Sequence, residues 1–92
     1  MNTIYKYGLA LIDSQEVMLP PAALILSAQV QGAKIYIWVE LDTTEIALAE
    51  PRVIRIHGTG HPVPTKGSRF IDTVQLSGGS LVFHVFEVNY VK

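Results

Sequence analysis

The chain has 92 residues, a formal net charge of −1 and no cysteine. This length allows one domain over residues 1–92, and the lack of cysteine excludes a disulfide framework and any thiolate metal site. The near-neutral charge argues against a general nucleic-acid-binding protein. Hydrophobic residues make up 49% of the composition. Because so short a chain buries only a modest core, we expect part of its apolar surface to be covered in a homo-oligomer.

The N-terminal segment does not have the pattern of a secretory signal peptide. It lacks a basic region, a long apolar run and a small-residue cleavage site. No stretch approaches the roughly 18 uninterrupted apolar residues of a membrane span. The sequence therefore predicts a soluble intracellular protein that does not enter a membrane.

Apolar and polar residues alternate, or run in short blocks bounded by Gly, Pro and Asp, which is typical of β-strands. The predicted strands are residues 3–11, 16–19, 22–30, 34–41, 52–57, 69–76 and 80–90. A tight hairpin is expected at residues 31–33. One short helix near residues 43–49, capped by Asp42 or Thr43, is an alternative to a loop there. These elements predict an all-β fold, a small antiparallel sandwich or barrel of about seven short strands.

Alternation also assigns side chains to faces of the strands. In the fourth strand, four aliphatic residues form one face, while Tyr36, Trp38 and Glu40 form the other, which is a candidate oligomer surface. In the last strand, His84 interrupts one apolar face and Glu87 the other. Buried polar groups need partners, so each is expected to bond loop backbone, a basic residue such as Arg55, or a ligand.

The stretch HGTGHP, residues 57–62, lies in a connection too rich in Gly and Pro for a helix or strand. Gly58 and Gly60 allow successive N–H groups to converge on an anion, and Thr59 adds a hydroxyl. From residue 52 to 69 there are four cations, two histidines and no acidic residue. This field favours a phosphorylated small molecule or an acidic partner surface. The alternative is that the glycines and prolines serve only the loop and that its cations are solvated.

Two other interpretations of the histidines are weaker. His57, His61 and His84 could ligate zinc, but a four-residue spacing brings ligands together only on a helix. Residues 57–59 spell one H-x-T element of the kind that two-histidine phosphodiesterases carry twice, and no second copy follows His84. No metal site, catalytic constellation or cofactor is predicted, so we expect a protein that is not an enzyme.

The segments TIYKY, ILSAQVQ, IYIWVELD, RVIRIHGTGHPVP and GGSLVFHVFE resemble a family of small uncharacterised proteins of bacteriophages and prophages. The resemblance covers nearly the whole chain, and GTGHP is its most specific part; residues 58–62, His84 and Glu87 match. In that family the residue before GTGHP is often tyrosine rather than His57, which weakens the metal and H-x-T hypotheses. The resemblance implies a phage origin and the cytoplasm of the bacterial host, but no activity.

Small phage β proteins include virion or tail accessory parts, inhibitors of host factors, and oligomeric sponges that sequester nucleotide signals of bacterial antiphage defence. A sponge fits best, because the chain offers a basic glycine-containing loop for phosphates and aromatic residues to stack a base, namely Tyr36, Trp38, Phe70 or Tyr90. The alternative is a protein-binding inhibitor or a virion component. The predicted binding residues for an anionic small molecule, such as a cyclic nucleotide, are Arg55, Gly58, Thr59, Gly60, His61, Lys66, Arg69, His84 and Trp38.

Overall fold

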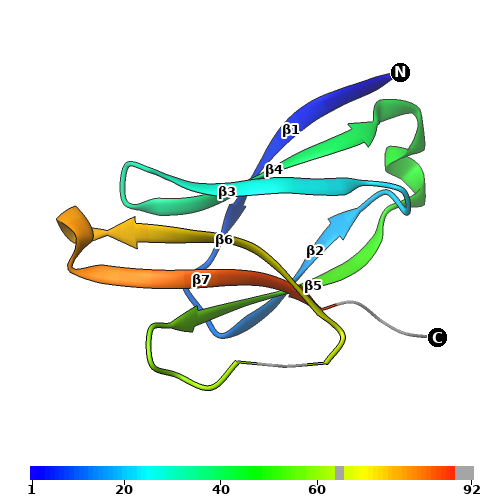
Figure 1. Ribbon diagram of the computed structural model, residues 1–92. Helices are drawn as coiled ribbons and strands as arrows, with labels where there is room; N and C mark the ends of the chain where they lie inside the picture. The colour runs from blue at the N-terminus through cyan, green and yellow to red at the C-terminus, as the bar shows by residue number, and fades with distance from the viewer. Residues whose placement is uncertain (64–65, 89–92) are drawn as a thin grey trace.

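The structure is a computed structural model that describes residues 1–63 and 66–88 (Figure 1). In these residues the strands are β1 (Asn2–Leu9), β2 (Ser14–Leu19), β3 (Leu24–Gln31), β4 (Lys34–Asp42), β5 (Glu50–Gly58), β6 (Ser68–Leu76) and β7 (Leu81–Val88). Two short 3-10 helices are η1 (Thr43–Leu48) and η2 (Ser77–Gly79). The predicted all-β fold and the short helix after the fourth strand are confirmed. The end of the last predicted strand, with Tyr90, lies outside the described residues.

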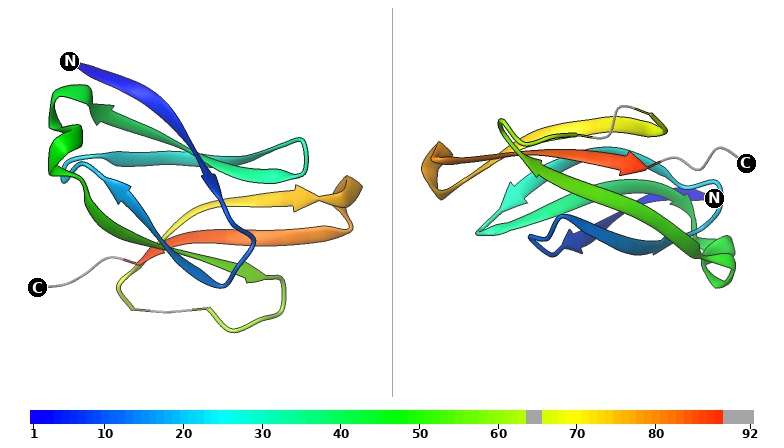
Figure 2. Two further views of the ribbon diagram at one scale, coloured as in Figure 1. Left: turned by 180° about the vertical axis from the view of Figure 1, so that it is seen from behind. Right: turned by 90° about the horizontal axis from the view of Figure 1, so that it is seen from below.

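The strands form two antiparallel sheets (Figure 2). Sheet A has the order β1-β4-β3, and sheet B has the order β2-β5-β7-β6. Neighbours in sequence form the hairpins β3–β4 and β6–β7, whereas β1 pairs with β4 and β2 pairs with β5. The result is a sandwich and not a closed barrel, which decides between the two predicted architectures.

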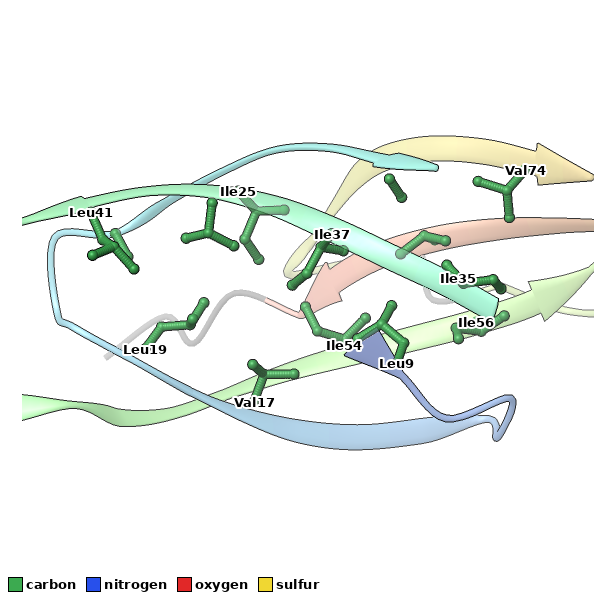
Figure 3. Close-up of a cluster of buried hydrophobic side chains, with 14 of the residues drawn as sticks. Leu9, Val17, Leu19, Ile25, Ile35, Ile37, Leu41, Ile54, Ile56 and Val74 are labelled. Carbon is green, nitrogen blue, oxygen red and sulfur yellow. The ribbon is translucent and has the colours of Figure 1, made fainter. Parts of the chain in front are cut away.

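The hydrophobic core lies between the inner faces of the two sheets. Figure 3 shows side chains from β1 to β6 converging there, and Leu19, Ile37 and Ile54 are each 0% exposed. The aliphatic face that alternation assigned to the fourth strand is this inner face of β4. Burying one such side chain contributes about 1.5–3 kcal/mol, so the core is the main source of stability.

The chain crosses from sheet A to sheet B through η1. Asp42, one of the two predicted cap residues, caps this helix. Its Oδ1 accepts hydrogen bonds from Thr44 Oγ1 at 2.7 Å and from Thr44 N at 3.0 Å. These two bonds lower the pKa of the Asp42 carboxyl, and the N-terminal amine adds to the effect. The helix ends where Ala49 N donates to Ile46 O at 3.1 Å, and β5 follows directly.

A buried ion pair also lies between the sheets. Glu87 on β7 is 4% exposed and points inward, on the face opposite to that of His84. It pairs with Arg52 on β5, and its Oε1 lies 3.7 Å from Arg69 on β6. Arg52 also donates to the carbonyl of Ala23 at 3.0 Å. The basic partner of Glu87 is therefore Arg52 together with Arg69, and not Arg55, the residue that the sequence suggested.

Two side chains of β6 cover the free edge of β3, which runs beside β6 (Figure 1). Arg69 donates to the Ile25 carbonyl at 2.9 Å, and Asp72 accepts from Ala28 N at 3.3 Å. Backbone groups at a strand edge need partners, and these bonds supply them while joining the two sheets. Arg69, a predicted ligand-binding residue, thus takes part in holding the sandwich together.

Candidate functional site

The outer face of sheet B collects several of the predicted binding residues. His57 on β5 is directly opposite His84 on β7, and Arg55 is opposite Phe86. The rings of His57 and Phe86 meet edge to face, with their centroids 5.7 Å apart. Arg55, His57 and His84 therefore share one surface, because side chains of paired residues point to the same side of a sheet.

His84 is held by two threonine hydroxyls. Its Nε2 lies 2.8 Å from Thr59 Oγ1 and its Nδ1 lies 2.9 Å from Thr73 Oγ1. Thr59 and His84 have the spacing of a nucleophile and its base, but the other ring nitrogen meets a hydroxyl and not a carboxylate that would stabilise an imidazolium. With both nitrogens occupied, His84 anchors the 58–61 turn to the sheet.

The GTGH segment forms a tight turn, in which His61 N donates to Gly58 O at 3.1 Å. Gly60 has a φ of +88°, the value that a glycine supplies at the third position of a type II turn. Thr59 N lies 3.4 Å from Val82 O, to which it donates. The backbone N–H groups of Thr59 and His61, which lie in the segment predicted to bind an anion, therefore already donate hydrogen bonds within the chain.

Beside this turn lies a pocket of about 290 Å³, which we call the Arg55 pocket; it is lined by Asp13, Arg55, Ile56, His57, His61 and Pro62. Arg55 Nε and His57 Nε2 are both buried, and neither has a hydrogen-bond partner in the part of the chain that the structure describes. His57 is 7% exposed. The pocket is therefore lined by two residues that each have a buried nitrogen without a hydrogen-bond partner among the described residues, and Asp13 lies at its border.

The protonation of His57 depends on this environment. Its pKa is lowered from 6.5, first by burial and then by the positive charge of Arg55, while Asp13 and a hydrogen bond with the Pro62 backbone oppose the shift. The lowered pKa favours the neutral ring, which has one donor and one acceptor nitrogen, whereas the protonated ring has two donors.

A second hollow of about 510 Å³ adjoins the Arg55 pocket, and the two share His61. It is mainly apolar and is lined by Gly58, Thr59, His61, Ser80, Leu81, Val82 and Phe83. The His61 ring packs on Gly58, where an added Cβ would lie 3.2 Å from the ring. Because Gly58 has no side chain, the His61 ring can lie between the polar Arg55 pocket and the apolar hollow.

The structure does not bring all predicted residues to this place. Trp38 lies on the outer face of sheet A, where its Nε1 donates to Gln29 Oε1 at 3.0 Å, so it faces away from the Arg55 pocket. Arg69 points into the sandwich, and Lys66 is exposed. Of the aromatic residues predicted to stack a base, Phe70 lies on the same face as Arg55, and its ring meets Phe86 with centroids 5.5 Å apart.

Four residues of the Arg55 pocket were absent from the predicted set: Asp13, Ile56, His57 and Pro62. A signal for His57 was available, because alternation in β5 places it on the same face as Arg55. Asp13 carried no such signal, since it reaches the pocket through the pairing of the β1–β2 turn with β5, where Ile56 N donates to Asp13 O at 3.0 Å. Pairing between distant segments cannot be read from local periodicity.

Among residues 1–63 and 66–88, no three His, Cys, Asp or Glu side chains come close enough together to hold a metal ion. Over the same residues, no helix has the length and apolar character needed to cross a membrane.

The fold and this site define a small two-sheet β domain with a partly buried basic pocket at one end of its four-stranded sheet. The chain belongs to the family described as Domain of unknown function (DUF7352), whose model matches residues 1–92. This agrees with the resemblance to an uncharacterised family over nearly the whole chain. No curated protein and no solved structure matches the chain.

Proposed function

We propose that this protein is a non-enzymatic binding protein that holds an anionic small molecule in the Arg55 pocket. The observation that carries the proposal is the pair of buried nitrogens, Arg55 Nε and His57 Nε2, without partners among the described residues. A buried polar group left unsatisfied costs about 1–3 kcal/mol, so such groups are rare unless they have a use. A phosphate or carboxylate would accept a charge-assisted hydrogen bond from the guanidinium.

The surroundings favour a nucleotide over a bare anion. Asp13 would accept a hydrogen bond from a sugar hydroxyl or an amino group of a nucleotide. The adjoining apolar hollow, with Leu81 and Phe83, suits a flat base. In this arrangement the phosphate lies against Arg55 and His57, and the base lies on the far side of His61.

The biological role that we propose is sequestration of a nucleotide signal of bacterial antiphage defence, in the cytoplasm of the host. Support comes from the resemblance to phage proteins and from His84, whose two nitrogens bond threonine hydroxyls rather than forming a catalytic pair with a carboxylate. A sponge needs a binding pocket and no turnover.

The test is a thermal-shift panel of cyclic dinucleotides, cyclic trinucleotides, cyclic ADP-ribose isomers and mononucleotides. A ligand at 100 times its Kd stabilises the fold by about 2.7 kcal/mol. We expect one nucleotide class to raise the Tm of the native protein and to lose most of that effect in Arg55→Ala. Lys34→Ala is the matched control, because it removes the same charge from the β3–β4 hairpin, outside the pocket.

Ligand recovered after denaturation should be chemically unchanged; a hydrolysed product would contradict sequestration. A shift that survives Arg55→Ala would place the ligand elsewhere, and a flat panel would contradict nucleotide binding.

A second candidate function is binding to a protein, as an inhibitor of a host factor or a virion component. Phe70 favours it, because this aromatic side chain is 52% exposed on the same face as Arg55. Aromatic residues and arginine are both enriched in protein interfaces. This function predicts that Phe70→Ala abolishes capture of a partner from host lysate while no nucleotide changes the Tm.

A further inference from the structure

The outer face of sheet A carries an apolar group that nothing in the chain covers among the described residues. Ile4 on β1 and Leu24 on β3 flank Glu40 on β4, and they are 56% and 50% exposed. A bulge in β3 leaves Leu26 unpaired, 42% exposed and next to Ser27, the residue that pairs with Trp38. Contiguous exposed apolar groups on a small soluble domain mark interaction surfaces.

The charges on this face are separated along the strand direction. At one end, the ammonium groups of Lys6 and Lys34 both lie over the Tyr36 ring, 4.6 Å and 5.9 Å from its centroid. Lys6 reaches that end because its Nζ donates to Gln31 at 2.9 Å. Towards the other end, Glu40 accepts a hydrogen bond from the neutral Asn2 side chain at 3.0 Å and has no ion-pair partner in the described part of the chain.

A surface with a cationic end, an apolar middle and an anionic end is complementary to itself after a rotation of 180°. An isologous dimer uses the same patch on both copies, so each end of one copy meets the opposite end of the other. We propose that the outer face of sheet A binds a second copy of this chain, about a two-fold axis near Trp38. In that dimer Glu40 of each copy faces Lys6 of the other.

The register follows from the strand pairing. Lys6 is opposite Trp38, and its ammonium extends one row beyond, over Tyr36. Glu40 lies two residues from Trp38 in the other direction along β4. A two-fold axis at Trp38 therefore places Glu40 and its neighbours across the sheet, in one copy, against Tyr36 and its neighbours in the other. The apolar side chains around Trp38 pack on their copies, as the faces of two stacked sheets do.

The expected dimer is weak. Three strands of this length cover a footprint of about 30 by 14 Å, from the usual rise and spacing of strands. This is below the roughly 800 Å² per partner of standard interfaces. Association in the micromolar range follows, which weakens at high salt because its specificity is electrostatic.

The experiment is sedimentation velocity of the full chain from micromolar to millimolar concentration. We expect a concentration-dependent dimer, with Kd raised by about tenfold or more in Lys6→Glu and in Glu40→Lys, since each places like charges opposite one another. The double variant, Lys6→Glu with Glu40→Lys, should return Kd close to the native value. Glu16→Lys, an exposed reversal on β2 of sheet B, is the matched control and should leave Kd unchanged.

A monomer at every concentration overturns the proposal. So does a dimer that the single reversals leave intact, that the double variant fails to restore, or that Glu16→Lys weakens equally. Circular dichroism and Tm of each variant separate loss of association from loss of folding. The readout does not involve the nucleotide, so this proposal and the proposed function succeed or fail separately.

Discussion

Replacing Glu87 with alanine should destabilise the fold more than any surface substitution in the chain. The variant removes the buried partner of Arg52, whose side chain is 19% exposed, and leaves its guanidinium between the sheets without an anion. Breaking a buried ion pair from one side typically costs about 3–5 kcal/mol. Arg52 keeps its bond to Ala23, and the 41% exposed Arg69 side chain can turn to water, so we expect the lower end, about 3 kcal/mol.

For a domain of this size each kcal/mol lowers the Tm by about 4–8 °C, so the loss corresponds to roughly 12–24 °C. Chemical denaturation followed by circular dichroism measures it directly. Glu87→Gln keeps the acceptor oxygen and removes only the charge, so its loss should be smaller. Glu16→Ala, at an exposed position of β2, should stay within about 0.5 kcal/mol.

Coupling is tested by a double-mutant cycle with Arg52→Met and Glu87→Leu. Removing both charges should cost less than the sum of the two single variants, because neither partner is then left buried alone. A loss below about 1 kcal/mol for Glu87→Ala, or strict additivity in the cycle, would refute the reasoning that this pair is buried and mutually dependent.

Two further predictions concern the site. Because the pKa of His57 is lowered from 6.5 by burial and by Arg55, the folded state binds fewer protons than the unfolded state below pH 6.5. Stability should therefore fall as the pH drops from neutral through this window, and a bound anion should oppose the fall. In His57→Gln the plot of Tm against pH should be flatter. An unchanged plot would show that His57 is not the group responsible. Gly60→Ala places a side chain at a φ of +88° and should cost about 1–2 kcal/mol in denaturant unfolding. A neutral effect would show that the turn can change its conformation freely.

The sequence by itself determined the local structure of this protein. Alternation divided β4, β5 and β7 into two faces each and placed His84 and Glu87 on opposite faces of β7, because side chains of a strand alternate regardless of which strand it pairs with. The turn between β3 and β4, with Gly32 at a φ of +62°, and the Asp42 cap of η1 were also predictable, since both depend on residues within a few positions.

The tertiary structure alone decided which of these surfaces meet. Pairing of β1 with β4, and of β5 with β7, places Trp38 on one outer face and Arg55 on the other, so a single site cannot contain both. Pairing of β2 with β5 brings Asp13 to His57, and pairing of β6 with β7 makes Arg69, a predicted ligand-binding residue, a partner of Glu87. Distant segments of similar pattern compete as pairing partners. The pairing that forms is determined by burial of the shared core and not by local periodicity.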